Sequence, residues 1–281
     1  MKDPKILYIL IIIFCIFAII AGIYAQFIAQ KNDETNNLNV EETIMMEEGE
    51  KSQVELKEQL NELFTNTLNL NGYDTTGIQK LNTEEDIVYT AYDIQETNDV
   101  YEVNMKIPAV NIKNELSITL NNATQTTFIN KANEIIANKE SKKKTIYTID
   151  YAAYVNNDIL SLVIRSTLKE GTAAQRVMIQ TYNYNLTNNT EASLVDLITV
   201  KKLNKDEVND KIAKVVKIAY NESQALKNMG YNQIYNRDLT NEMYTVDGAG
   251  VYFLGPNGEL YIIYPYGNNE FTSTMDIILL E

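Results

Sequence analysis

The 281-residue sequence contains no histidine, no tryptophan and a single cysteine. Without histidine it cannot build a Ser-His-Asp triad, a Cys-His dyad or a histidine metal site. The lone Cys15 lies in an apolar run, so neither an intrachain disulfide nor a thiolate cluster is available. We therefore expect a protein that is not an enzyme and that needs no metal or cofactor, although catalysis by carboxylates alone stays open.

Basic residues are also scarce, and the charge is unevenly distributed. The chain has 24 Lys and Arg against 38 Asp and Glu, a net charge of −14. Residues 31–99 hold 4 Lys against 17 Asp and Glu (−13), whereas residues 100–281 hold 18 basic and 20 acidic residues (−2). A charge run of this kind is usually a solvated spacer. The nearly neutral remainder shows no basic stripe with interleaved aromatics, so we expect no nucleic-acid partner.

A long apolar run begins close to the N-terminus. Ile6 to Ala25 (ILYILIIIFCIFAIIAGIYA) is uncharged, and a helix of about twenty residues spans a hydrocarbon core of ~30 Å. Lys2 and Lys5 precede the run and acidic residues follow it, so the positive-inside rule places the N-terminus in the cytoplasm. We predict an uncleaved single-pass anchor in the cell membrane; a signal peptide cleaved after Ala25 is the alternative.

These patterns divide the chain into four parts. We expect a cytoplasmic tip at 1–5, a transmembrane anchor at 6–28, an acidic spacer with a juxtamembrane helix at 29–82, and an extracytoplasmic domain at 83–281. The helix starts at Ser52, is expected to end at about Asn69 to Gly72, and has an apolar stripe at helical spacing: Leu56, Leu60, Leu63, Thr67 and Leu70. We expect this helix to pack on its own domain. A coiled coil that dimerises the chain is the alternative, for which two heptads are few.

The pattern changes to alternation from about Glu84, which indicates strands. Alternating or apolar runs predict strands at 87–91, 100–107, 146–155, 159–168, 176–186, 250–254, 259–264 and 274–280. Pro108 is expected to end the second of these, because proline cannot donate to a ladder. Helical periodicity predicts helices at Leu116–Asn138 and Asn204–Lys227. We therefore predict an α+β fold, an antiparallel sheet with two packed helices, preceded by an N-terminal transmembrane helix.

Two regions resemble a bacterial extracytoplasmic domain family. The first is YEVNMKIPAVNIKNELSITLNNATQTTFINKANEII, and the second joins the strand pair ILSLVIRSTLKEGTAAQRVMIQTYNYNL to the hairpin VYFLGPNGELYIIYPYG. Their order is similar to that of the exported region of RsiV-like anti-sigma factors. It is also similar to the non-catalytic N-terminal region of membrane-anchored peptidoglycan deacetylases of the PdaC type. The resemblance implies an extracytoplasmic ligand-binding module, lysozyme being the ligand of the sensor branch.

The sequence departs from that family in three places. Only Met1 to Lys5 precede the anchor, too few residues to hold a sigma factor. The absence of histidine removes the metal ligands that the deacetylase branch requires. The loop Pro265 to Asn269 replaces a more apolar loop, which puts the identity of the ligand in doubt if this loop contacts it.

Candidate binding residues gather near the C-terminal hairpin and on two strands. The aromatic set is Tyr252, Tyr261, Tyr264, Tyr266 and Phe271. Such a set is typical of an amphipathic patch for protein or glycan, but strand tyrosines that pack on a core give the same pattern, and we favour that interpretation. Arg165 and Arg176 could form a cationic pair for a carboxylate. A cross-strand ion pair with a neighbour such as Glu170 is the favoured use.

The sequence thus predicts a membrane-anchored binding or sensing module of the bacterial envelope. Its expected ligand outside the cell is a cell-wall component or a lysozyme-like protein. A carboxylate-dependent hydrolase of wall polymers and a structural or interaction protein of the envelope are the alternatives. The sequence leaves the oligomeric state open.

Overall fold

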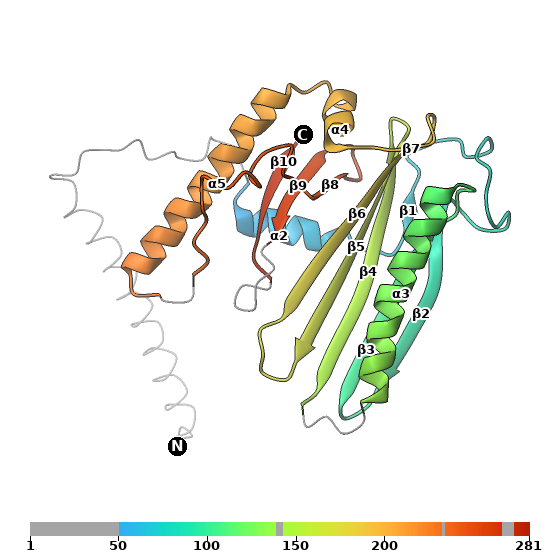
Figure 1. Cartoon of the computed structure of the whole chain (residues 1–281), viewed down its shortest axis with the longest axis horizontal. Coiled ribbons are helices and arrows are strands. Elements are labelled where there is room, and N and C mark those ends of the chain that lie inside the picture. The colour runs from blue at the N-terminus through green and yellow to red at the C-terminus, as the bar shows by residue number, and fades with distance from the viewer. Residues whose placement is uncertain (1–50, 139–142, 232–233, 266–272) are drawn as a thin grey trace, which may run out of the picture. The chain divides into compact units, whose positions relative to one another are not determined.

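The computed structural model describes residues 51–138, 143–231, 234–265 and 273–281, all within the compact unit Met46–Glu281. The predicted anchor and most of the acidic spacer lie outside these ranges. Within them, no helix combines the length and apolar character needed to cross a membrane. The described residues form an α+β fold with four helices and two sheets (Figure 1).

The larger sheet is mostly antiparallel, with the strand order β2-β3-β4-β5-β6-β7 and with β1 beside β4. Its strands are β1 (Leu68–Asn69), β2 (Val88–Thr97), β3 (Tyr101–Val110), β4 (Thr145–Asn156), β5 (Ile159–Glu170), β6 (Arg176–Asn185) and β7 (Thr190–Glu191). The pairs β3–β4 and β1–β4 are parallel, so the expectation of a purely antiparallel sheet is wrong there. The helix between β3 and β4 carries the chain back along the sheet, and such a crossover makes its two strands parallel.

That crossover helix, α3 (Glu115–Ala137), confirms the predicted helix and covers one face of the large sheet (Figure 1). Asn114 caps it by accepting the Ser117 N–H at 2.7 Å. Its buried stripe includes Phe128, Ala132 and Ile135, which join the core formed by the strands beneath. Burial of this stripe holds the helix on the sheet.

The smaller sheet is antiparallel, has the order β10-β9-β8, and separates two further cores. Its strands are β8 (Val251–Leu254), β9 (Leu260–Pro265) and β10 (Met275–Leu280). The helices α4 (Leu194–Val200) and α5 (Lys205–Asn228) cover one face and α2 (Gln53–Glu62) covers the other. The buried stripe of α5 includes Val208, Ile212, Val216 and Ala219.

The chain after α2 does not continue as the predicted helix. The helix ends at Glu62, and Leu68–Asn69 pairs with β4 as a short parallel strand. Asn66 adopts a positive φ of 58°, which a helix cannot contain. Its side-chain oxygen accepts the Tyr151 N–H at 3.0 Å, which fixes the chain beside β4. Leu56 and Leu60 are buried within the same chain against the smaller sheet.

Pro108 does not end its strand either, because β3 runs to Val110. The ladder between β3 and β4 stops at the pair Met105–Ile149, so Pro108 lies beyond it. On the other side, the register of β2 shifts between Thr90 and Tyr92. Proline fits a strand where a bulge or an open edge removes the need for a donor.

Candidate functional site

Three turns from distant parts of the sequence meet around a polar cavity of about 430 Å³. They are the segment 70–73 after β1, the turn 156–158 between β4 and β5, and the turn 257–258 between β8 and β9. Lys201, at the end of α4, completes the lining. The sequence identified each turn or chain break locally but gave no indication that they meet.

The residue types in these turns follow from their backbone angles. Asn71, Asn157 and Asp158 have φ values of 49°, 46° and 64°, and Gly72 and Gly258 have 81° and 80°. Glycine adopts positive φ without a Cβ penalty, and Asn and Asp tolerate it best among the other residues. The asparagine and aspartate residues that permit these tight turns therefore also place side-chain amides and a carboxylate around the cavity.

Two asparagine side chains join the three turns. Asn71 Nδ2 shares its hydrogens among Val155 O at 3.1 Å, Asn156 Oδ1 at 2.8 Å and Pro256 O at 3.1 Å. Asn156 Nδ2 donates in turn to Gly255 O at 2.9 Å. Each bond crosses between turns, so the cavity is held in one arrangement before any ligand arrives.

Several polar side chains of the lining are left for a ligand. In the part of the chain that the structure describes, no hydrogen bond or ion pair engages the side chains of Tyr73, Asn157, Asp158, Lys201 and Asn257. Amide groups both donate and accept, while the ammonium only donates and the carboxylate only accepts. The cavity can therefore satisfy a ligand rich in hydroxyl and amide groups.

The concavity extends beyond the three turns. A second hollow of about 290 Å³ shares Lys201 and Asn257 with the first and adds Glu259. A third, of about 240 Å³ between α2, α5 and β10, shares Lys51 and Glu281 with the second. We call these three adjoining hollows the trough. Its rim carries both signs of charge, which favours neutral or zwitterionic ligands over strongly charged ones.

Glu259 is the buried charged group of the trough. Its carboxylate accepts the Asn257 N–H at 2.8 Å, and its residue is only 9% exposed. Burial, and then the nearby Glu259 charge, raise the pKa of Tyr154 to about 12. A Cβ at Gly255 would lie 2.7 Å from the Tyr261 ring and 3.0 Å from the Glu259 carboxyl carbon, so the turn needs glycine there.

The predicted aromatic set does not form one surface patch. Tyr261 and Tyr264 are buried on opposite faces of the smaller sheet, and Tyr252 is half-buried. Tyr266 and Phe271 lie outside the described residues. Tyr261 and Tyr264 are three residues apart on β9, so their side chains point to opposite faces of the sheet. The interpretation of the set as one surface patch is therefore wrong for these two residues.

The contacts of the two buried tyrosines show how they pack. The Tyr261 ring stacks on Phe253 with centroids 4.7 Å apart, and its hydroxyl accepts from Gln59 at 2.7 Å. Tyr264 donates to Thr245 O at 2.9 Å. Burial raises the pKa of both hydroxyls. These are core residues with satisfied polar ends, as the favoured sequence interpretation predicted.

The two predicted arginines do not form a joint cationic site. Arg165 donates to Asp150 at 2.9 and 2.6 Å, and its guanidinium lies 4.2 Å from the centre of the Phe64 ring. Arg176 pairs with Glu170, which confirms the favoured cross-strand ion pair for this residue. Arg165 uses a different carboxylate because Asp150 faces it directly across β4 and β5.

The sequence gave no signal for a buried ion pair behind the smaller sheet. Arg237 Nε and Nη2 each donate to Asp276 at 2.7 Å, and Nη1 donates to Ala219 O at 3.1 Å. This ties the segment after α5 to β10. Because both oxygens of its carboxylate accept hydrogen bonds from Arg237, Asp276 is a structural residue rather than a candidate acid or base.

Comparisons with known proteins give structural neighbours only. No family model matches the chain, and no curated protein does. It is similar to the crystal structure of a DUF3298 family protein from Pseudomonas aeruginosa PAO1, at 12% identity and a TM-score of 0.36 over 64% of this chain and 81% of that one. A DUF3298 family member from Bacteroides fragilis gives 12% identity and 0.34 over 74% and 91%. Both TM-scores are below 0.5.

Proposed function

We propose that the chain is a membrane-anchored, extracytoplasmic binding module whose trough binds a cell-wall oligosaccharide. One observation carries the proposal: Asn71 and Asn156 cross-link three distant turns into a concave site. Five polar side chains of its lining, those of Tyr73, Asn157, Asp158, Lys201 and Asn257, have no partner among the described residues. A site fixed in advance loses little entropy when a ligand binds.

The chemistry of the trough suits such a ligand. Amides of Asn157 and Asn257 can pair with sugar hydroxyls and acetamido groups, and Tyr73 offers a half-buried ring beside them. Lys201 and Glu259 lie in the same trough and match the opposite charges of attached peptide stems. The apolar run Ile6 to Ala25 supplies the proposed anchor.

Calorimetric titration of the full chain in detergent micelles with muramidase-released wall fragments tests the proposal. The double variant Lys201→Ala/Asn257→Ala removes two side chains without protein partners, so it should fold normally and bind at least about tenfold more weakly. The double variant Lys217→Ala/Asn188→Ala, at exposed positions outside the trough, is the control and should bind normally. Unchanged affinity in the first variant, or no binding by the unsubstituted chain at physiological salt, would contradict the proposal.

A lysozyme-like protein is the second candidate ligand, favoured by the acidic run at residues 31–99. Such a run attracts a basic partner over a distance, and salt weakens the attraction. Pull-down with lysozyme at physiological salt separates the two ligands. Retention of lysozyme together with failure of the wall fragments would replace the oligosaccharide by a protein as the ligand.

The proposal favours binding over hydrolysis. Among the described residues the buried carboxylates are Glu259 and Asp276, and Arg237 holds Asp276. The other carboxylates that line the trough, Asp158, Glu222 and Glu281, are exposed to solvent, whereas a catalytic acid is usually a carboxyl group whose pKa is raised by burial. A glycosidase of the usual kind needs two available carboxyl groups that flank the scissile bond. Incubation of wall fragments with the full chain, followed by chromatography, should return them uncleaved.

A further inference from the structure

The two long edges of the large sheet differ in their protection. The outer strand β2 has an irregular register between Thr90 and Tyr92 and carries Asp93 and Glu96. Bulges and charges of this kind prevent unwanted strand pairing. The opposite strand β6 pairs with β5 in unbroken register from Arg176 to Asn185. Of these two edges, β6 is therefore the one suited to accept another strand.

Within the described ranges, the outer edge of β6 is covered by another strand only at its C-terminal end. Its last residues pair with β7, and Asn183 Nδ2 donates to Tyr252 O of the smaller sheet. The Ala192 N–H donates to Asn183 O, so the backbone groups of Asn183 point away from β5. Because the direction of the backbone groups alternates along a strand, the N–H and C=O groups of Ile179 and Val177 also point away from β5. No strand of the described residues pairs with them there.

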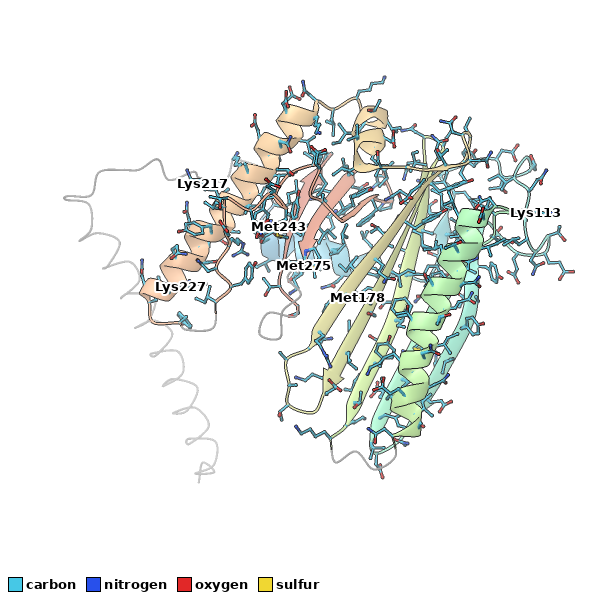
Figure 2. All side chains as sticks on the ribbon, viewed as in Figure 1. Lys113, Met178, Lys217, Lys227, Met243 and Met275 are labelled. Carbon is cyan, nitrogen blue, oxygen red and sulfur yellow. The ribbon has the colours of Figure 1, made fainter. Side chains whose placement is uncertain are left out.

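The uncovered part also exposes apolar surface. Met178 lies on β6 (Figure 2) and its residue is 42% exposed. It lines a mostly apolar hollow of about 490 Å³ between α3 and the sheet, together with Phe128, Tyr147 and Leu168. An exposed apolar side chain beside unpaired backbone donors and acceptors is typical of a surface that another strand covers.

We propose that a second copy of this chain covers this edge, with β6 pairing antiparallel to β6 about a two-fold axis at Met178. In that register Val177 faces Ile179 of the second copy, and the outward backbone groups of both exchange hydrogen bonds. Met178 then packs on Met178 of the second copy. Arg176 faces Gln180 of the second copy, so no like charges are directly opposed.

Self-complementarity is the reason to choose a second copy over an unrelated strand. A two-fold axis requires each residue type to suit its mate, and here apolar residues meet apolar residues and a cation meets an amide. One strand pair buries far less than the ~1,600 Å² of a standard interface, so we expect weak association in solution. Chains anchored in the same membrane would associate more strongly, because the membrane raises their effective concentration. Only this stronger association depends on the proposed anchor.

Disulfide trapping of the full chain in detergent micelles tests the pairing. In a Cys15→Ser background, Met178→Cys places two thiols opposite each other, with Cβ atoms about 4.5–5.5 Å apart. Copper phenanthroline takes up the two electrons as the S–S bond forms and both thiol protons leave. We expect a covalent dimer at least about tenfold more abundant than with Met229→Cys, an exposed control on the turn after α5.

The register has its own test. Arg176→Cys and Gln180→Cys chains should cross-link when mixed, whereas neither should cross-link with itself, because residues four apart along a strand lie about 13 Å apart. Equal yields from Met178→Cys and Met229→Cys, or no dimer in either experiment, would overturn the proposal. A covalent dimer at Met178 without the mixed 176–180 product would also overturn the register. None of these outcomes depends on ligand binding by the trough.

Discussion

At the scale of single residues, asparagine performs two tasks in this protein. Asn71 and Asn157 both adopt positive φ in turns of the trough. Only Asn71 also bonds across to the other turns, through Val155, Asn156 and Pro256. Variants at these two positions therefore distinguish the stability lost with the cross-links from the stability lost when a turn residue is changed.

Replacement of Asn71 by glycine should lower the free energy of unfolding by about 1–2 kcal/mol. Glycine keeps the positive φ but removes the amide, so buried or half-buried carbonyls of the neighbouring turns lose a donor. Asn157→Gly, which removes no internal hydrogen bond, should change stability by less than about 0.5 kcal/mol. Urea unfolding of both variants measures the difference. Equal effects would mean that the cross-links do not stabilise the trough.

At the scale of elements, α2 belongs to the core of the domain. Leu60 is 1% exposed and packs with Tyr261 and Ile263 of the smaller sheet. Ser52 and Glu55 form a capping box at its start, with the Ser52 N–H donating to Glu55 at 2.8 Å. The cap and the buried leucines explain a stable helix of only ten residues.

Leu60→Ala should therefore lower the free energy of unfolding by about 2–5 kcal/mol, because it leaves a cavity in the core. Val54→Ala, on the exposed side of the same helix, is the matched control and should cost little. Thermal unfolding and the mass of the full chain should be measured together. If Leu60→Ala changed the oligomeric mass without lowering stability, the alternative of a coiled coil through this helix would be favoured.

Local pattern predicted most of the elements, and for α3, α5, β4 and β5 it placed both ends to within two residues. The periodicity of α3 and α5 and the hairpins at 156–158 and 255–258 were recognisable, because these depend on neighbouring residues. The end of α2 at Glu62 was missed, because the Asn66 bond to Tyr151 that redirects the chain spans 85 residues. The strand through Pro108 likewise depends on where a neighbouring ladder stops.

The site escaped prediction for the same reason. Asn71 lies 85 residues from Asn156 and 185 from Pro256 in the chain, yet it bonds to both. A single sequence shows three ordinary turns there. The aromatic set around the hairpin was the more visible pattern, and its members Tyr261 and Tyr264 proved to be core residues.

At the scale of the folded unit, the trough and the open edge lie at different ends of the strands. The trough includes the turn before Ile159, whereas the open part of β6 faces residues 164–168 of β5. A ligand in the trough and a second copy at β6 would therefore occupy separate surfaces. Binding and dimerisation can be measured independently.

Buried and half-buried tyrosines of the large sheet should make the folded unit sensitive to alkali. Burial raises the pKa of Tyr147, Tyr154 and Tyr182 from an ordinary value of 10 to about 12. The folded state therefore keeps its protons where the unfolded state has lost them. Stability should be full below about pH 10 and fall as the pH rises from about 10 to 12.

Urea unfolding across that range, with the phenolate absorbance followed in parallel, checks this expectation. Tyr154→Phe should make the loss less steep, although it also removes the hydrogen bond to Leu63 O. If all the tyrosines of the folded protein ionised near pH 10, these side chains would not be buried as described.

Hydrogen exchange of the full chain, with and without muramidase-released wall fragments, tests the binding trough most directly. Backbone amides in a ligand-covered turn exchange more slowly than in the open site. Slower exchange is predicted at residues 69–73, 155–158 and 255–259, with β2 unaffected. Fragments that bind without slowing exchange in these three segments, or that protect another surface instead, would contradict the account.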